Sequence, residues 1–174
     1  HVSSDYGVDF VKTNNNIAGT ITPHHMLLTK EDVFKDKEIN PHHYCMPVVK
    51  NEKDLTSLRN AACFNNSKFF LGTDSAPHHV VDKKQNDSLK AGIFSSSNSI
   101  ELYALIFEEE NALENLEKFS SINGPKFYNL DVNNQYLILD KEDRIVPEFI
   151  QEGNIKIKNF YANKKIHWKV SQLE

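Results

Sequence analysis

Two short apolar runs, each followed by a helix-like segment, constrain the fold of this chain more than any other feature. The first run spans residues 17–28, and it reads as a strand up to Thr22 because Pro23 lacks the amide proton that a strand ladder needs. The second run spans residues 68–74. No Asn-Gly or Asp-Gly turn separates the two runs. The order strand, helix, strand, helix therefore predicts parallel β/α units.

Capping residues mark the expected helices. Ser3 and Ser4 are suitable caps for a first helix. Asn51 can cap a second helix, with Asp54 at the position where a capping box places an acid. Asn98 begins a third helix that is apolar around much of its circumference, so we expect it to be buried.

The carboxyl-terminal part of the chain is less regular. A further helix is expected from Asn111, and Gly124 followed by Pro125 has the composition that ends helices. From Tyr128 onward, short apolar runs alternate with charged turns, which indicates edge strands and loops. Residues 79–99 are polar, and a connector of this length is typically a functional lid or a mobile loop.

Composition narrows the class of protein. The chain has 174 residues, of which 39% are hydrophobic, and this suits one globular domain. The sequence holds no apolar run near the roughly 20 residues of a membrane-spanning helix and no signal-peptide layout, so we expect a soluble, cytoplasmic protein. A net charge of -4 with interspersed lysines and acids offers no basic stripe for nucleic acid. The two cysteines are too few for a disulfide framework.

Polar residues gather where the predicted strands end. Asp74 follows the second apolar run, and a charge at the carboxyl edge of a parallel sheet needs a cation, a metal ion or hydrogen-bond donors as its partner. The alternative for an isolated aspartate is a helix cap. Imidazole groups after strands suit metal binding or proton transfer. Six of the eight histidines form adjacent pairs, which are His24 with His25, His42 with His43, and His78 with His79.

Each of these histidines also has an ordinary structural alternative. Adjacent residues in an extended segment point to opposite sides, so at most one of each pair is expected in a site. A hydrogen-bonded role in the core is the alternative for any one of them. Cys45 could act as a nucleophile with His42 or His43, but its apolar neighbours favour a buried, unreactive thiol. For Trp168, packing is the favoured role.

Five segments of the sequence, in this order, resemble the dihydroorotases of the amidohydrolase superfamily, in their short single-function class. They are GTITPHHMLLT, NPHHYCMPVVK, FFLGTDSAPHH, KAGIF and INGPKFYNL. The resemblance covers essentially the whole chain, and the combination of GTDSAPH with YCMPVVK is specific. It implies an α/β fold, the (β/α)8 TIM barrel. The chain would be its carboxyl-terminal portion from the end of strand six, with barrel elements over residues 1–127 and a C-terminal extension over residues 128–174.

The resemblance also implies an activity. Dihydroorotases interconvert (S)-dihydroorotate and N-carbamoyl-L-aspartate in de novo pyrimidine (UMP) biosynthesis, at a site with two metal ions, usually zinc. We therefore expect two Zn²⁺ ions and a small-molecule substrate, with the bridging carboxylated lysine and several other site residues outside this chain. Neither a membrane nor nucleic acid is expected as a partner, and the family allows for a homodimer.

Individual residues of this chain match positions of the family's site. The resemblance implies that Asp74 is both a metal ligand and the catalytic acid/base, and that His1 is a second metal ligand. It implies that the His78 side chain contacts the substrate carboxylate. The remaining implied roles are a backbone contact to the substrate at Met46, another at Ala91, and a supporting position beside the site for His25.

Two other functions stay open from the sequence. A hydantoinase- or allantoinase-like enzyme would keep the barrel and the metals but open a different cyclic amide. Met46, His78 and residues 90–94 favour dihydroorotate. A non-catalytic barrel that serves as an assembly partner would typically have lost its ligands, whereas the ligand positions that fall in this chain are filled.

Overall fold

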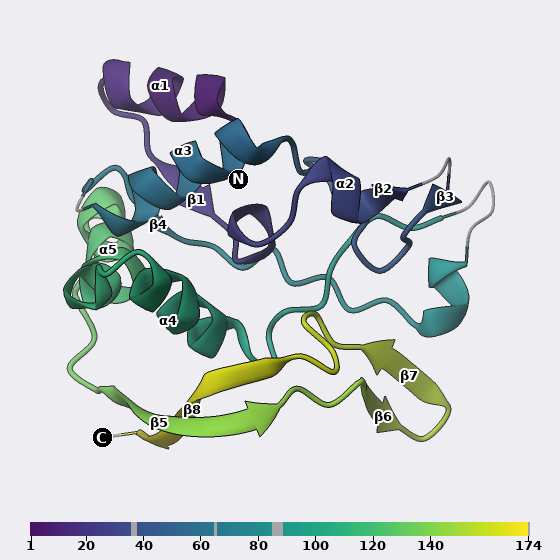
Figure 1. Ribbon diagram of the computed structural model, residues 1–174. Helices are drawn as coiled ribbons and strands as arrows, with labels where there is room; N and C mark the ends of the chain where they lie inside the picture. Colours follow the sequence, from purple (N-terminus) through teal and green to yellow (C-terminus); the bar gives the residue numbers. More distant parts are fainter. Residues whose placement is uncertain (36–37, 65, 85–88, 174) are drawn as a thin grey trace.

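A pair of parallel strands lies among the helices of the molecule, in a computed structural model that describes residues 1–35, 38–64, 66–84 and 89–173 (Figure 1). Strand β1 (Gly19–Ile21) pairs with β4 (Phe69–Leu71), and the amide of Gly19 donates to the carbonyl of Lys68 at 2.9 Å. The amide of Val2 donates to the carbonyl of Thr20 at 2.9 Å. Backbone groups of adjacent strand residues point to opposite edges, so the first residues of the chain lie along the other edge of β1. The predicted parallel arrangement is confirmed.

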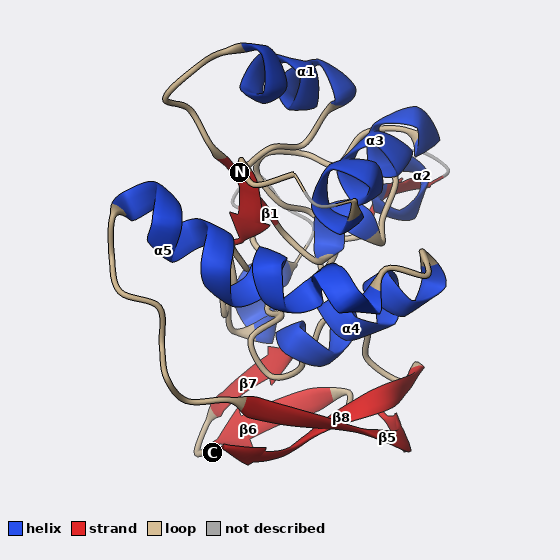
Figure 2. Ribbon diagram, turned by 90° about the vertical axis from the view of Figure 1, so that its left-hand side faces the viewer, coloured by secondary structure: helices blue, strands red, loops and turns tan. Residues whose placement is uncertain are grey.

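Helices pack around this pair, and the later strands form a separate layer (Figures 1 and 2). The α-helices are α1 (Asp5–Thr13), α2 (Lys30–Val33), α3 (Glu52–Cys63), α4 (Ser99–Glu109) and α5 (Asn123–Tyr128). The other strands are β2 (Phe34–Lys35), β3 (Glu38–Ile39), β5 (Leu137–Ile145), β6 (Phe149–Glu152), β7 (Ile155–Lys158) and β8 (Lys165–Leu173). Shorter helical turns are η1 (His24–Met26), η2 (Val80–Lys83), η3 (Leu113–Asn115) and η4 (Lys118–Ile122).

The predicted helix starts are found in the structure. Ser4 caps α1, and its hydroxyl accepts a hydrogen bond from the amide of Gly7 at 3.1 Å. Asn51 and Asp54 form the capping box that begins α3. Asn98 precedes α4, whose residues from Glu101 to Phe107 are all buried. The capping residues therefore locate these three helix starts, although the Asn98 side chain makes no capping hydrogen bond and donates to the carbonyl of Phe160 instead.

The expectation that a helix ends at Gly124 and Pro125 is wrong. Both residues lie inside α5, near its start, where the ring of Pro125 is tolerated because first-turn amides need no helical acceptor. A Cβ atom on Gly124 would lie 3.3 Å from the ring of Phe70, so glycine lets the helix approach β4 closely. The helix ends instead at Asn129, which adopts a left-handed conformation with φ of 54°.

The last part of the chain forms two antiparallel strand pairs, β5 with β8 and β6 with β7. They lie together at one end of the molecule, below the helices in Figure 2. Strand β8 packs against α4: Ile166 is fully buried in a cluster with Leu102, and the indole of Trp168 donates to Glu108 at 2.9 Å. The prediction of strands after Tyr128 and of a packing role for Trp168 is confirmed.

Two further sequence expectations concern connectors and membranes. The polar connector after His79 contains η2, and its residues 85–88 lie outside the described part of the chain. Within the described ranges, no helix combines the length and the apolar character that crossing a membrane requires.

A buried hydrogen bond links α4 to the end of β1 and provides a test of the fold. The hydroxyl of Tyr103, a fully buried residue, donates to the carbonyl of Ile21 at 2.7 Å. Replacing Tyr103 with Phe leaves that carbonyl without this donor, so we expect the full-length protein to lose about 1–2 kcal/mol of unfolding free energy. Urea unfolding measures the loss. Tyr6→Phe is the control because Tyr6 is 81% exposed, and equal midpoints for the two variants would contradict the prediction.

Candidate active site

Two predicted site residues meet at the ends of the central strands. The Nε2 atom of His1 lies 3.7 Å from the Oδ1 atom of Asp74, and about a third of each side chain is exposed. His1 immediately precedes the segment that runs along β1, and Asp74 follows β4. The structure thus brings together the two residues for which the family resemblance implies metal binding.

The ring of His1 is oriented by β1. Its Nδ1 atom is hydrogen-bonded to the hydroxyl of Thr20 at 2.7 Å, so the other ring nitrogen, Nε2, faces Asp74. Thr20 in turn packs directly on Gly72, where a Cβ atom would come within 2.6 Å of the threonine Cβ. Glycine at position 72 is therefore required for β4 to approach the side chain that holds His1.

The backbone at Asp74 is strained and firmly anchored. Its φ angle is 46°, a left-handed conformation that aspartate tolerates better than most residues. The hydroxyl of Ser75, the next residue, accepts hydrogen bonds from the amides of Ser95 and Ser96, both at 3.0 Å, and the amide of Ala76 donates to the carbonyl of Ile93 at 2.9 Å. Burial raises the pKa of the Asp74 carboxyl. A neighbouring cation would have the opposite effect, because it would favour the ionised form.

A second group of predicted residues lies on the loops beyond Asp74. The Nε2 atom of His78 is hydrogen-bonded to the carbonyl of Ala91 at 3.0 Å. Gly92 has a φ angle of +142°, and a Cβ atom there would lie 2.8 Å from the same histidine nitrogen. The amide of Gly92 donates to the carbonyl of Tyr44 at 2.9 Å, which places residues 91 and 92 beside the segment that leads to Met46. Met46 itself is 60% exposed.

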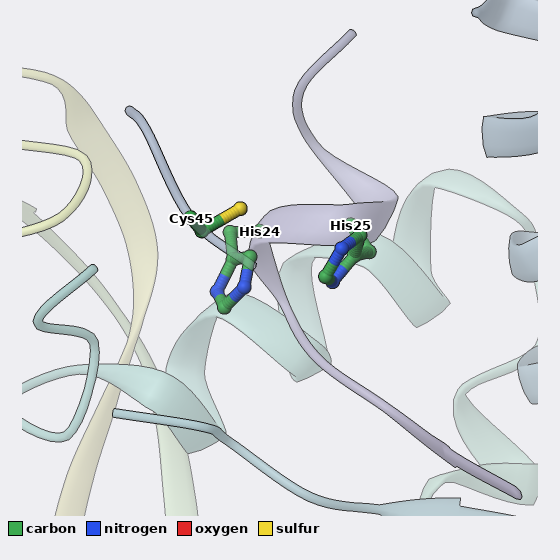
Figure 3. Close-up of side chains that lie close together, drawn as sticks. All are labelled: His24, His25 and Cys45. Atoms are coloured by element: carbon green, nitrogen blue, oxygen red, sulfur yellow. The ribbon is translucent and has the colours of Figure 1, made fainter. Parts of the chain in front are cut away.

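The pair His24 and His25 lies in a buried cluster with Cys45 (Figure 3). One candidate ligand atom from each of the three residues lies within 4.8 Å of the others. The two ring nitrogens of His25 are already engaged, Nδ1 by the hydroxyl of Thr22 at 2.6 Å and Nε2 by the carbonyl of Pro47 at 2.8 Å. His25 could bind a metal ion only by giving up one of these bonds, whereas both ring nitrogens of His24 are buried and have no hydrogen-bond partner in the described part of the chain.

Burial keeps both of these histidines neutral. The pKa of His24 is far below its ordinary value because the ring is fully buried, and His25 adds a smaller electrostatic contribution. Burial also lowers the pKa of His25 to about 4. His25, which is hydrogen-bonded through both ring nitrogens, has the core role that the sequence left open for any single histidine, whereas His24 is buried without such a bond among the described residues.

The candidate nucleophile Cys45 has the features of an unreactive thiol. Burial raises its pKa to about 11, and the thiol donates to the carbonyl of Pro47 at 3.3 Å. Cys63 is buried as well, with its pKa raised to about 12. The structure therefore favours the buried, unreactive role for Cys45.

Sequence reasoning missed Thr20 and Lys83, two residues that hold the site in place. Thr20 stands in a β-branched strand where nothing marks its contact with a histidine at the chain start. Lys83 is one of several lysines in a polar connector, yet it is only 5% exposed. Nothing in the sequence distinguishes Lys83 from the exposed lysines around it, so its burial could not be predicted.

Both the sequence comparison and the structure comparison find dihydroorotases similar to this chain. No protein-family model matches the chain. A dihydroorotase of Aliivibrio fischeri (strain MJ11) is 44% identical over 171 residues, covering 98% of this chain and 49% of that protein. A crystal structure of dihydroorotase from Saccharomyces cerevisiae in complex with 5-fluoroorotic acid matches with a TM-score of 0.89 and 34% identity, covering 100% of this chain and 50% of that one. This chain thus spans about half the length of the curated relatives that it matches.

A more distant structure supports the fold alone. A D-hydantoinase (dihydropyrimidinase) from Thermus sp. matches 100% of this chain and 42% of its own with a TM-score of 0.79, at 14% identity. The predicted fold class is confirmed: the chain has the structure of a portion of an amidohydrolase TIM barrel.

The low reactivity expected of the Cys45 thiol can be tested by alkylation. A thiol with a pKa of about 11 is about 0.1% thiolate at pH 8, and only the thiolate reacts readily. We expect iodoacetamide at pH 8 to leave Cys45 and Cys63 of the folded full-length protein unmodified while it modifies both in guanidinium chloride. Mass spectrometry of peptides measures the modification. Rapid alkylation of Cys45 in the folded protein would contradict this prediction and would support a role for Cys45 as a nucleophile.

Proposed function

Because this chain shares its fold and 44% of its aligned residues with a dihydroorotase, we propose that it is part of a metal-dependent hydrolase that interconverts dihydroorotate and N-carbamoyl-aspartate. The observation that carries the proposal is the approach of His1 and Asp74 to 3.7 Å at neighbouring strand ends. The family resemblance extends the proposal to a cytoplasmic enzyme of pyrimidine biosynthesis that uses two zinc ions and can form a homodimer. In this proposal residues 1–127 supply barrel elements and residues 128–174 an extension.

The two rival functions are less well supported. The hydantoinase is 14% identical to this chain, whereas the two dihydroorotases are 44% and 34% identical. The match to the hydantoinase therefore supports the barrel fold and gives no support for a hydantoinase substrate. A non-catalytic barrel would not need an oriented histidine facing a carboxylate. The hydrogen bond between Nδ1 of His1 and the hydroxyl of Thr20 is a feature that a binding site for a cation explains, because it leaves Nε2 of His1 facing Asp74.

The donors in this chain fit a zinc ion. Imidazole nitrogen and carboxylate oxygen are zinc ligands with bonds of about 2.0–2.2 Å, and two such ligands at tetrahedral angles lie about 3.3 Å apart. The separation of 3.7 Å between His1 and Asp74 is near that value. The Nδ1 atom of His1 is engaged by Thr20, which is how proteins commonly fix the tautomer of a metal-binding histidine. We propose that the other ligands, including a carboxylated lysine, come from outside this chain.

Divalent cations held by His1, Asp74 and ligands from outside this chain would supply a nucleophile at neutral pH, by lowering the pKa of water, and would polarise the ring carbonyl. Asp74 provides the proton transfers. Its carboxylate accepts a proton from the attacking nucleophile as the carbon–oxygen bond forms, and it delivers that proton to the ring nitrogen as the amide bond breaks. Its position at the anchored strand end keeps the acid/base group in one place during both transfers.

The loop residues orient the substrate in this proposal. The side chain of His78 contacts the substrate carboxylate, which fixes the ring relative to Asp74. The backbone groups of Met46 and Ala91 hydrogen-bond the polar edge of the ring. The structure brings His78, Ala91 and the segment before Met46 into one connected group, which supports a shared role.

Replacing Asp74 with Asn in the full-length protein tests the catalytic assignment. The amide cannot accept the proton, so we expect turnover of dihydroorotate to fall by about a hundredfold or more. A spectrophotometric assay follows the reaction, and metal analysis accompanies it. Asp140→Asn is the control because Asp140 lies exposed on β5. Turnover like that of the wild type in Asp74→Asn would remove Asp74 from the mechanism.

Replacing His78 with Ala separates substrate binding from metal binding. Loss of the imidazole should raise the KM for dihydroorotate about tenfold or more because a contact with the substrate carboxylate is lost, while metal content stays near normal. The control is His167→Ala, since His167 lies on β8 and pairs with Asp143. Loss of metal in His78→Ala would instead identify His78 as a ligand.

A further inference from the structure

Lys83 is a buried lysine in the connector that precedes Ala91. Only 5% of the residue is exposed, and a buried ammonium group must be hydrogen-bonded to be tolerated. Its Nζ atom donates to three backbone carbonyls: those of Gly92 at 2.7 Å, Lys90 at 2.8 Å and Tyr44 at 3.3 Å. An ammonium group has three N–H donors, so the number of acceptors matches the number of donors.

Three successive carbonyls, those of residues 90–92, are hydrogen-bonded alternately by Lys83 and His78. Lys90 and Gly92 accept from Lys83, and Ala91 between them is bonded to Nε2 of His78 at 3.0 Å. Because a carbonyl can only accept, Nε2 of His78 carries the proton. Successive carbonyls of an extended segment point to opposite sides. Residues 90–92 are therefore held from two sides.

The same ammonium group joins this segment to the one before Met46. Tyr44 accepts from Lys83 and also from the amide of Gly92, at 2.9 Å. Lys83 thus links, through one atom, the two stretches of backbone that the proposed function assigns to the polar edge of the substrate. No side chain contact of Lys83 with the substrate is needed for this effect.

We propose that Lys83 is a positioning residue that sets the backbone of Ala91 and Met46 for binding of the cyclic amide. The inference rests on the proposed function and adds to it a residue that acts without touching the substrate. Backbone groups that bind a small ring must be positioned to well within 1 Å, because a misplacement of about 1 Å can lower the rate by about a hundredfold. Two short connectors tied to a single ammonium group meet that requirement.

The charges around Lys83 are consistent with an ammonium form at neutral pH. Burial lowers the pKa of Lys83 to about 8, which still leaves the group mostly protonated at pH 7. His42, which lines the same small cavity, is neutral there because burial, followed by the charges of Lys158 and Lys83, lowers its pKa to about 4. Lys83 is also the residue type that suits the site: an arginine fork would match planar acceptors and not three converging carbonyls.

Lys83→Met in the metal-loaded full-length protein tests the proposal, with Lys84→Met as the matched control because Lys84 is its exposed neighbour. We expect Lys83→Met to raise the KM for dihydroorotate about tenfold, with metal content unchanged, and Lys84→Met to stay within about twofold of the wild type. Hydrogen exchange of a peptide that contains Gly92 should become faster in Lys83→Met alone, since its amide bonds Tyr44. Lys83→Gln, which keeps two N–H donors, replaces Lys83→Met if that variant does not fold, with a KM increase of about threefold.

The outcomes separate this inference from the proposed function. Unchanged exchange at Gly92 in the Lys83 variant overturns the positioning role, whether or not the enzyme is active. Faster exchange with an unchanged KM overturns the link to substrate binding, and a lower kcat at unchanged KM would reduce Lys83 to a structural residue. Absence of dihydroorotate hydrolysis in the wild type overturns the proposed function instead, and with it the substrate part of this inference.

Discussion

The side-by-side arrangement of the first residues, β1 and β4 is the constraint on which the site depends. Backbone hydrogen bonds on both edges of β1 fix three chain segments that are distant in sequence. Because these segments present their ends at one edge, Nε2 of His1 and Oδ1 of Asp74 come within 3.7 Å of each other. Thr20, on the middle segment, orients the histidine, and Gly72 lets the neighbouring strand approach closely enough for this to happen. The chemistry proposed for the site follows from this arrangement of strand ends.

A second layer of polar contacts holds the loops that extend from the strand ends. Ser75 fixes the backbone just past Asp74 by accepting from two amides, and Lys83 fixes residues 90–92 by donating to carbonyls. Both interactions are made with backbone, which confers precision without demanding particular side chains in the partner loop. The backbone groups proposed to bind substrate are therefore set by residues that need not contact it. Such support is typical of sites that must hold a small ligand in one orientation.

The sequence predicted much of the fold and part of the site, for physical reasons that can be named. Capping signals at Ser4 and Asn51 are local, so they located helices correctly. The stop signal at Gly124 is also local, but packing against Phe70 overrode it. The pairing of His1 with Asp74 came from the family resemblance, because no local pattern relates residues so far apart. Thr20 and Lys83 escaped notice since their importance arises only from tertiary contacts, and the neutral burial of His24 could not be read from its position after a strand.

The most direct test of this account is a crystal structure of the metal-loaded full-length protein, with anomalous scattering recorded at the absorption edge of the metal. The account predicts that Nε2 of His1 and a carboxylate oxygen of Asp74 each lie within about 2.0–2.2 Å of an anomalous peak. A peak among His24, His25 and Cys45, with the carboxylate of Asp74 turned away from any ion, would contradict it.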